Sequence, residues 1–339
     1  MSARLETATI DTDAALLRLA LEWDLLWRSA PQATPFQAPG WLLSWWEIFA
    51  PGTLSIVTVR RQGALIGLAP LYLEAGDGPA RLLPLGVPIT DYSDILVQPA
   101  SKREAVHALS DHLARSASWQ SLHWPDLPQD AGASSLAFPS SYRQTVGPPE
   151  VCPYLPLPET VAELATTLPP RKSRSLRMAA YRAERRGKVT LHSLPDRPAE
   201  NMLADLFVLH RLCWQMRGES GVLDDDRVQR FHMRAASKLA AAGVLRCYAL
   251  QIGGETAAVY YGFLRGEHAY GYLTGFNPAF SYESPGTLVV AHAIREAVRE
   301  GARAFHFLRG GEVYKYGWGA QDRWNTSRTI RRAHANAEA

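Results

Sequence analysis

Two stretches of the chain, 191 positions apart, share one pattern of apolar and polar residues. Residues 54–73 and residues 245–264 each contain an alternating apolar run, a short turn with glycine, and a second apolar run. Gly63 falls on Gly254 when the two stretches are aligned without a gap. Alternating runs joined by such a turn are typical of a β-hairpin. The pattern therefore predicts one module used twice, an arrangement that usually builds a cleft for a ligand.

The periodicity outside these hairpins predicts the other elements. In the first half it predicts helices over 16–27, 40–49 and 101–117, with Ser101 as a cap, and strands over 81–85, 94–97 and 121–124. In the second half it predicts helices over 158–167, 199–216, 225–242 and 285–300, a basic helix after Pro170, and strands over 189–194, 268–276 and 303–308. Residues 130–158 hold six prolines, which indicates a linker. We expect an α/β fold with mixed sheets and two tandem domains, residues 1–150 and 151–339.

Length indicates the number of domains, and charge points to one unusual segment. A chain of 339 residues fits about two domains. The 36 basic and 33 acidic residues give a net charge of +3, but residues 171–188 hold eight Lys or Arg and one Glu, a net charge of +7. Three interpretations of this segment stay open: a nucleic-acid surface, a site for an acidic ligand or polyanion, and a solvated helix face.

Cysteine usage and hydropathy bear on the compartment. Cys152, Cys213 and Cys247 form neither a C-x-x-C pair nor an even set, which disfavours a disulfide framework and a structural zinc site. We therefore expect a cytoplasmic protein without a metal and without a transmembrane segment. The leucine-rich stretch 14–27 is interrupted by charges and is too short to span a membrane. It predicts an amphipathic packed helix, with a membrane-surface helix as the alternative.

The strongest local signal is the start of the helix at Pro285. Ser284 suits an N-cap, and proline suits the first helical position. The N–H groups of Gly286 and Thr287 would then face the preceding loop as an anion site. The alternative is an ordinary capped helix without a ligand.

The strand before this helix contains Gly271 and Gly275. Glycine inside a strand indicates a bulge or the close approach of another group. A ligand would lie along Tyr272, Leu273 and Thr274 and bond to main-chain N–H and C=O groups. A twisted strand without a ligand is the alternative.

A loop with four glycines, residues 308–320, follows the last predicted strand. Arg309 and Lys315 are candidates to hold a phosphate or a carboxylate. Tyr314 and Tyr316 are candidates to donate a proton or to stack on a flat group. A solvated turn with aromatic anchors is the alternative.

In the first half, the segment ITDYSDIL brings Asp91, Tyr92 and Asp94 close together. Neighbouring carboxylates perturb each other's pKa and can supply a general base. The alternative is a loop whose aspartates cap turns.

In the second half, His210, Trp214 and Arg217 follow the helical spacing i, i+4, i+7. One helix face would carry all three toward the cleft, with His210 as a base. Trp214, Arg217 and Tyr261 are candidates for contact with an acceptor. A packed histidine at a helix end is the alternative, and no metal pattern includes it.

Five segments, in chain order, carry a resemblance to a known family. They are FQAPGWLLSWWEIFA (36–50), DYSDIL (91–96), RKSRSLRMAAYRAERRG (171–187), LHRLCWQMRGES (209–220) and YESPGTLVVAHAIREAVREGARAFHFLRGGEVYKYGWGA (282–320). Together they resemble the GNAT superfamily of N-acyltransferases over residues 36–320. The resemblance is strongest to the tandem-GNAT group, which includes CelD-like cellulose-biosynthesis acetyltransferases and is related to the Fem-type peptidoglycan transferases.

This resemblance implies two GNAT-like domains, with the final segment folding back onto the first, and acetyl-CoA or another acyl-CoA as co-substrate. It implies a pantetheine arm beside the bulged strand 270–276 and a pyrophosphate at residues 284–287. YESPG stands where the family carries Q/R-x-x-G-x-G/A, so an acyl carrier protein and aminoacyl-tRNA stay open as donors. The first copy has QPAS (98–101) at its helix start, without glycine, and we expect it to have lost donor binding.

We therefore expect direct acyl transfer to an amine or hydroxyl of a small-molecule or saccharide acceptor, in envelope or exopolysaccharide metabolism. Asp91, Asp94 or His210 would be the base, and a tyrosine, Tyr92 or Tyr314, would protonate the leaving thiolate. Two other functions stay open: Fem-type aminoacyl transfer from charged tRNA, and a non-catalytic module that binds a polymer or a partner. The chain is expected to be a monomer or a homodimer.

Overall fold

The computed structural model describes residues 4–216, 218 and 221–333. Its internal contacts divide the chain into two compact units. The first unit holds the chain up to Glu150 together with the segment from Trp324 onward, and the second unit holds residues 151–323. Both units combine sheets and helices, as the sequence predicts.

The first unit contains two sheets. One has the strand order β1-β3-β4-β7, and the other has the order β10-β17-β8-β6-β5-β2, with β9 also paired to β17. The elements are β1 (Leu5–Ile10), α1 (Asp13–Ser29), η1 (Pro35–Gln37), α2 (Pro39–Phe49), β2 (Gly52–Leu54), β3 (Ile56–Arg61), β4 (Ala64–Ala69), β5 (Leu71–Glu74), β6 (Arg81–Pro84), β7 (Leu96–Val97), η2 (Pro99–Ser101), α3 (Lys102–Arg115), β8 (Ser121–Pro128), η3 (Gly132–Ser135), β9 (Tyr142–Val146), β10 (Glu150–Val151) and β17 (Trp324–Arg332).

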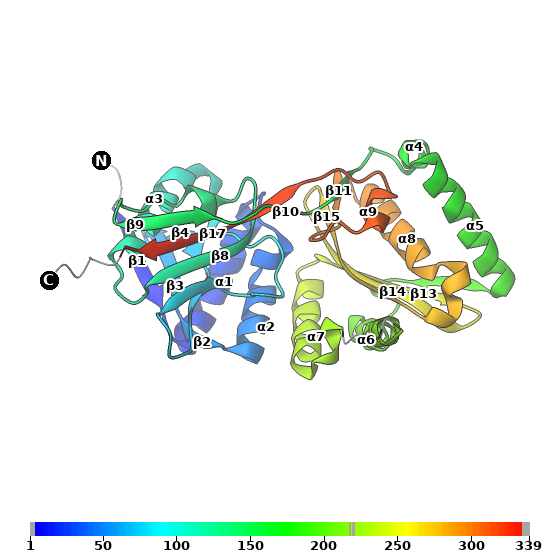
Figure 1. Cartoon of the computed structure of the whole chain (residues 1–339), viewed down its shortest axis with the longest axis horizontal. Helices are drawn as coiled ribbons and strands as arrows, with labels where there is room; N and C mark the ends of the chain where they lie inside the picture. The colour runs from blue at the N-terminus through cyan, green and yellow to red at the C-terminus, as the bar shows by residue number, and fades with distance from the viewer. Residues whose placement is uncertain (1–3, 217, 219–220, 334–339) are drawn as a thin grey trace. The chain divides into compact units, whose positions relative to one another are not determined.

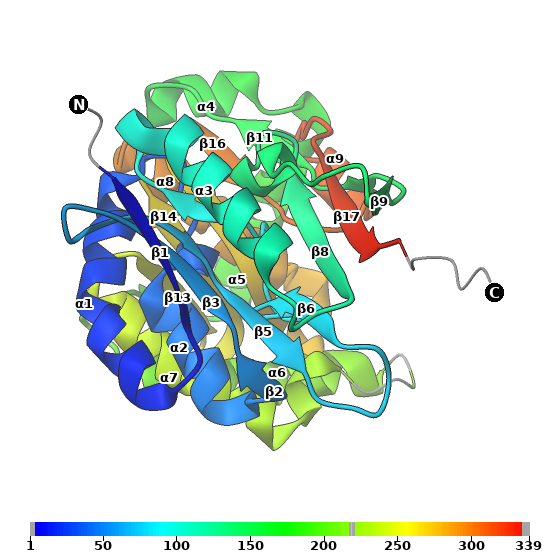
Figure 2. The same cartoon turned by 90° about the vertical axis from the view of Figure 1, so that its left-hand side faces the viewer.

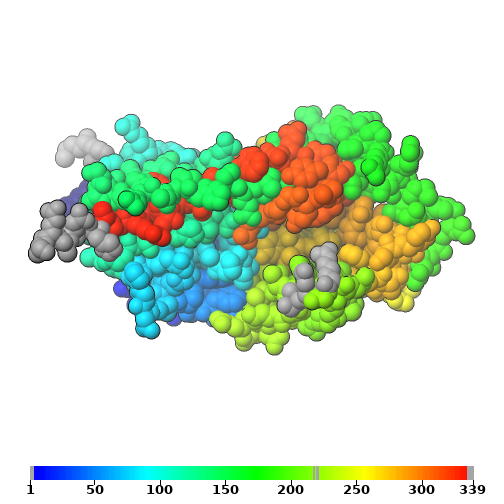
Figure 3. All heavy atoms as spheres, in the orientation of Figure 1, coloured from blue at the N-terminus to red at the C-terminus, as the bar shows by residue number. Residues whose placement is uncertain are grey.

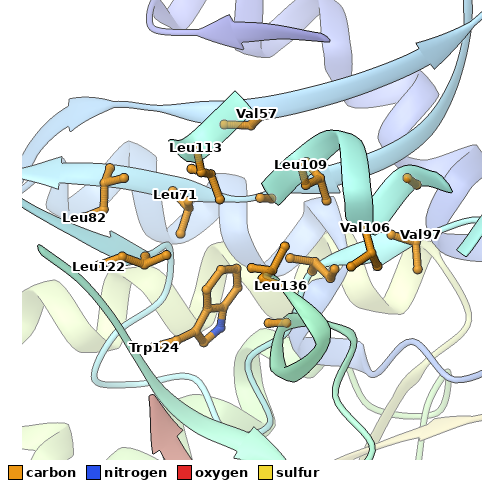
Figure 4. Packing of buried hydrophobic residues seen from close by; sticks show 14 of the residues in the cluster. Val57, Leu71, Leu82, Val97, Val106, Leu109, Leu113, Leu122, Trp124 and Leu136 are labelled. Atoms are coloured by element: carbon orange, nitrogen blue, oxygen red, sulfur yellow. The ribbon is translucent and has the colours of Figure 1, made fainter. Parts of the chain in front are cut away.

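The core of the first unit lies between its strands and α3. In Figure 2, α3 lies in front of these strands and α1 and α2 lie behind them. Leu71, Leu82 and Leu122 of the strands point toward Leu109 and Leu113 of α3 (Figure 4), and each of these leucines is at most 1 % exposed. Full burial of a leucine side chain stabilises a fold by about 1.5–3 kcal/mol. The predicted hairpin is present as β3 and β4. Ser101 precedes α3, but its side chain makes no cap hydrogen bond, so the expected cap is wrong.

The C-terminal strand β17 completes the first unit. It pairs antiparallel with β8 on one side and with β9 on the other, and its red atoms lie among the green atoms of that unit in Figure 3. Ile330 of β17 is 1 % exposed and belongs to the core cluster of this unit. The linker expected over residues 130–158 is wrong, because this segment forms η3, β9, β10 and β11.

The second unit is one sheet of order β11-β16-β15-β14-β13-β12 with helices on both faces. In Figure 1, α5 and α8 lie on one face of β13 and β14, and α6 and α7 lie on the other. The elements are β11 (Tyr154–Pro156), α4 (Val161–Thr167), α5 (Pro170–Arg186), β12 (Val189–His192), α6 (Ala199–Gln215), η4 (Val222–Asp224), α7 (Asp226–Ala241), β13 (Leu245–Ile252), β14 (Glu255–Arg265), β15 (His268–Phe276), η5 (Pro278–Glu283), α8 (Pro285–Arg299), β16 (Ala304–His306) and α9 (Val313–Tyr316).

Candidate active site

The parallel strands β15 and β16 of the second unit part after a short paired stretch. Their pairing ends at Tyr270 and His306. Beyond that pair, β15 continues beside β14 to Phe276, whereas the chain after β16 turns away and the Phe307 N–H bonds to the carbonyl of Pro153. A strand that leaves its neighbour presents main-chain N–H and C=O groups to a ligand. We call this opening between the parted strands the fork.

β15 carries a bulge beside the fork, as its glycines predict. Tyr261 of β14 pairs with Leu273, whereas the next residue, Gly262, pairs with Gly271, so Tyr272 is the extra residue. The ring centroid of Tyr272 lies 5.7 Å from that of Tyr261. A bulge increases the local twist and redirects a side chain. This bulge therefore lets the Tyr272 ring pack against the sheet, while the main chain of β15 stays beside the fork.

α8 begins at Pro285 with an unusual cap. Ser284 has a left-handed backbone (φ 53°) and its side chain makes no cap hydrogen bond, which corrects the expected hydroxyl cap. Its carbonyl accepts hydrogen bonds from the N–H groups of Thr287 at 3.1 Å and Leu288 at 3.3 Å. Within the described residues, Gly286 keeps the first-turn N–H that has no protein acceptor. Of the two N–H groups predicted to bind an anion, that of Gly286 is thus available, whereas that of Thr287 is engaged.

Two arginines of α5 hold the loop that precedes α8. Arg182 donates to the carbonyl of Tyr282 at 3.2 Å, and its guanidinium lies 4.4 Å from the centroid of that ring. Arg186 lies 3.7 Å from the carboxylate of Glu283, a side chain that is only 4 % exposed. The negative charge of Glu283 beside the α8 start is therefore faced by a guanidinium, and α5 contributes positive charge to this region.

His210, the predicted base on α6, has one ring nitrogen that already accepts a hydrogen bond. The Trp214 indole N–H donates to His210 Nε2 at 2.8 Å. Since an indole N–H can only donate, Nε2 carries the lone pair and the neutral ring carries its proton on Nδ1. A Cβ on Gly221 would lie 2.3 Å from His210 Cε1, so the following loop needs glycine there. Arg217, predicted on the same face, lies outside the described residues.

A buried aromatic cluster joins α7 to the bulge, and no sequence pattern indicates its histidine. His232 is 1 % exposed, and its ring lies 5.6 Å from Tyr261 and 5.5 Å from Tyr272 between centroids. Burial, with a smaller effect of His210, lowers the pKa of His232 to about 3. The hydroxyl of Tyr261 is buried without a hydrogen-bond partner. Tyr261, expected to contact an acceptor, is thus part of the core behind the bulge at 0 % exposure.

A histidine pair, also without a sequence signal, stands at the base of the fork. His306 is 3 % exposed, and its Nε2 lies 3.1 Å from Nδ1 of His268. The rings of His306 and Tyr270 stack with centroids 4.9 Å apart and planes 16° apart. Burial, with smaller effects of His268 and Arg323, holds the pKa of His306 well below its usual range. His306 is therefore a neutral imidazole at physiological pH.

The loop after β16 differs from its expected role. The Lys315 ammonium is buried, donates to the carbonyls of Arg309 at 2.5 Å and Gly310 at 2.9 Å, and pairs with Glu312 at 2.8 Å. Lys315 therefore holds the loop together and is not a phosphate ligand. Tyr314 is 57 % exposed and available to a ligand.

Two further residues of this loop have defined environments. Arg309 is half-buried, and its role in binding a phosphate stays a prediction. The Tyr316 hydroxyl donates to Asp322 at 2.8 Å, a contact that orders the turn after α9. The aromatic anchors expected in this loop are thus partly engaged within it.

The aspartates of the first unit are parts of its loop structure. Asp94 accepts hydrogen bonds from the N–H groups of Ile95, Gly132 and Ala133, each at 2.7 Å. Desolvation nevertheless raises the pKa of Asp94 to about 6. The carboxylate caps the η3 turn, which was the alternative to a catalytic role.

The rest of this loop occupies the place that corresponds to the fork. β6 and β8 pair in parallel, as β15 and β16 do, and the Ser93 N–H then bonds to the carbonyl of Asp126 on β8 at 3.1 Å. Asp91 and Tyr92 are 6 % and 2 % exposed, and Tyr92 has a left-handed φ of 51°. Loop residues thus bridge the two strands where the second unit has an opening.

Residues 4–216, 218 and 221–333 contain no group of three or more His, Cys, Asp or Glu side chains arranged to hold a metal ion. Within the same residues, every helix is too short or too polar to cross a membrane.

Most of the second unit matches a family of known proteins. A family model described as an acetyltransferase (GNAT) domain matches residues 170–316. These residues are therefore similar to a GNAT acetyltransferase domain. The matched segment runs from the start of α5 to the end of α9, so the GNAT domain includes the fork, the bulge and the start of α8. No curated protein sequence matches the chain.

Solved structures share the fold over nearly the whole chain. FemX superposes with a TM-score of 0.63 at 14 % identity, over 95 % of this chain and 96 % of FemX. A conserved protein of unknown function from Bacteroides thetaiotaomicron VPI-5482 gives 0.58 at 12 % identity, over 96 % of this chain and 100 % of that protein. A tandem GNAT protein from the clavulanic acid biosynthesis pathway gives 0.47 at 15 % identity, over 96 % and 98 %. The superposition with FemX shows that the fold is shared, and the predicted α/β fold with mixed sheets in two units is confirmed.

Proposed function

We propose that this chain is an acyltransferase that takes an acyl group, such as acetyl, from acyl-CoA and passes it to an amine or hydroxyl of a small-molecule or saccharide acceptor. The observation that carries the proposal is the combination, within the GNAT domain, of a fork, a bulged strand beside it and the free Gly286 N–H at the start of α8. An acyl-CoA would use the fork and the bulged strand for its thioester arm and the Gly286 N–H for its pyrophosphate.

The proposed donor binding and acyl transfer use the open main-chain edge of β15. The pantetheine arm would bond to the main chain of Leu273 and Thr274, of which Leu273 is half-buried and Thr274 exposed. The pyrophosphate would meet Gly286 and the positive charge of Arg186. The acceptor atom attacks the thioester carbonyl, a main-chain N–H of β15 stabilises the oxyanion, and the C–S bond breaks. Holding both substrates in line supplies much of the rate enhancement.

The first unit would not bind a donor. Its loop bridges the strands that correspond to the fork, through the Ser93 N–H and the Asp126 carbonyl. Its helix α3 also begins after Pro99–Ser101 without a glycine. One donor site per chain is therefore expected, measured as the stoichiometry of titration with acetyl-CoA.

Calorimetric titration of the Gly286→Trp variant tests the donor site. A Cβ on Gly286 meets nothing closer than 3.6 Å, so the fold tolerates a side chain, but an indole would cover the free N–H. We expect acyl-CoA affinity to fall at least about tenfold, equivalent to 1.4 kcal/mol. Gly78→Trp is the matched control, since a Cβ there meets nothing within 4 Å. Absence of heat with acetyl-CoA and with longer acyl-CoAs in the parent chain would contradict the proposal.

The basic helix α5 favours a second candidate, aminoacyl transfer from charged tRNA. Arg171, Arg174, Arg177 and Arg185 are exposed along it, a density of positive charge suited to a phosphate backbone. In this case tRNA would shift in a gel at low salt and acyl-CoA would not bind. A negative gel shift at low salt removes this candidate.

A further inference from the structure

A cavity of about 410 Å³ lies beside β13 in the second unit. It forms where β12 stops short of its neighbour, because the last pair of these strands joins His192 to Ala249, whereas β13 begins at Leu245. Its walls come from residues 191–194, from residues 245–248 and from α8, which packs on one face of β13 (Figure 1). The volume falls in the range of about 300–1,000 Å³ that is usual for sites of small ligands.

This cavity is separate from the proposed donor site. The donor site uses the start of α8 at Pro285, whereas His292, Glu296 and Glu300 line the cavity. Because an α-helix rises about 1.5 Å per residue, these three residues lie about 10–22 Å further along the helix axis than Pro285. In the sheet, β14 stands between the strands of the fork and those of the cavity. A ligand here would therefore be a second ligand of this unit.

The charged side chains of the cavity wall already have partners of opposite charge. The Arg246 Nε–H donates to both carboxylate oxygens of Glu300, at 2.8 Å and 3.0 Å. The other carboxylate of the wall, Glu296, accepts a hydrogen bond from Arg299. A charged ligand would have to compete with these two ion pairs. The wall therefore favours a neutral ligand.

Three polar groups of the wall are available to such a ligand. Within the described residues, the hydroxyls of Ser193 and Tyr248 and the Nε2 atom of His292 have no hydrogen-bond partner in the protein. Burial lowers the pKa of His292, and its Nδ1 atom lies 3.7 Å from Glu296, beyond a hydrogen bond. The ring is therefore neutral, with one nitrogen that donates and one that accepts. Each of the three side chains can thus both donate and accept a hydrogen bond.

We propose that this cavity binds a neutral saccharide unit, whose hydroxyls bond to Ser193, Tyr248 and His292. A sugar hydroxyl also donates and accepts, so it matches groups of this kind. The rings of Tyr248 and His292 meet edge to face with centroids 4.8 Å apart, and Tyr248 also stacks on Tyr260 at 5.8 Å. These contacts hold the rings in place before a ligand arrives, which reduces the entropic cost of binding. The site goes beyond the proposed function, because acyl transfer at the fork does not require it.

Saturation-transfer NMR on the full chain tests the class of ligand. The neutral probes are methyl glucoside and N-acetylglucosamine, and their charged counterparts are glucuronate and glucosamine. We expect the neutral probes to bind and the charged ones to bind more weakly, because the charges of the wall are already paired. Binding of a charged probe alone, or of no probe, would overturn the proposal.

Two conservative variants test the location of the site. Tyr248→Phe removes the hydroxyl and keeps the ring that packs on Tyr260 and His292, and Ser193→Ala removes the other hydroxyl. In each variant we expect the affinity for the neutral saccharide to fall about fivefold, the usual effect of one lost hydrogen bond. Tyr181→Phe is the matched control, because Tyr181 lies on α5 outside the cavity and is 53 % exposed.

Titration with acetyl-CoA separates this proposal from the proposed function. Tyr248→Phe and Ser193→Ala should bind acetyl-CoA as the parent chain does, since the cavity is separate from the start of α8. Saccharide affinity equal to that of the parent in both variants would place the sugar elsewhere and overturn the cavity site. Failure of the parent chain to bind any acyl-CoA would instead overturn the proposed function, and the saccharide measurements would still decide on the cavity.

Discussion

The imidazole of His210 shows how one hydrogen bond limits what a side chain can do. Its position at the end of α6 suits a base, but the Trp214 N–H at 2.8 Å occupies the lone pair that would accept a proton. Lys315 is a parallel case, because main-chain carbonyls and Glu312 surround its ammonium. Residue type and spacing identify polar groups, whereas the partners of each atom decide whether the group is available.

His232 makes the stability of the fold depend on pH. Its pKa is lowered from 6.5 to about 3 in the folded chain, so the folded state binds fewer protons than the unfolded state between these values. Stability attributable to this group is therefore complete above pH 6.5 and falls as the pH drops toward 3. At pH 5 the loss relative to pH 7 is about 2 kcal/mol, since one pH unit is worth about 1.4 kcal/mol.

Urea unfolding of His232→Gln at pH 7 and pH 5 measures this effect. The variant should lose less stability than the parent between the two pH values, by about 2 kcal/mol. His107→Gln is the control, because the His107 side chain is 78 % exposed, and it should follow the parent. Equal pH dependence in all three proteins would contradict the burial argument.

Among the elements, β15 and η5 show what sequence could and could not predict. The bounds of β15 follow from local signals, because apolar alternation and flanking turn residues specify it, and its glycines indicate the bulge. The cap of α8 did not follow, because Ser284 is left-handed in a loop that Arg182 and Arg186 of α5 hold. Those contacts join residues about 100 positions apart, and no local pattern encodes them. The same holds for His268 and His306, whose spacing of 38 carries no motif.

The charge at the η5–α8 junction leads to a prediction about donor affinity. Glu283 is a buried carboxylate beside the proposed polyphosphate site, with Arg186 at 3.7 Å. Glu283→Gln removes a repulsive charge and frees the guanidinium, so acyl-CoA should bind about 2–5-fold tighter, the effect of one charge at a helix terminus. Calorimetric titration measures this change. Glu184→Gln, an exposed position of α5, should change affinity less, and weaker binding by Glu283→Gln would argue against a phosphate at this junction.

At the scale of the whole molecule, the two units differ in how the chain forms them: the first unit consists of two separate segments and the second unit of one continuous segment. It leaves the first unit at Glu150, builds the second unit, and returns at Trp324 to add β17 between β8 and β9. Residues 130–158 therefore could not be recognised as structured from sequence alone, since the partner of β9 lies almost 190 positions further on. Long-range strand pairing of this kind depends on topology and not on local propensity.

The dependence of the first unit on its returning strand is open to a direct test. Ile330 is 1 % exposed in the core of that unit, so Ile330→Ala should cost about 2–5 kcal/mol, the usual effect of emptying a buried aliphatic site. Amide hydrogen exchange should then accelerate in β8 and β9, which pair with β17, with β13 and β14 of the second unit as the internal reference. Arg331→Ala, an exposed position of the same strand, should leave exchange close to that of the parent. If the amide protection of β8 and β9 is unchanged in Ile330→Ala, β17 does not stabilise the first unit. If protection is lost selectively in these two strands, the final strand is an integral part of the first unit.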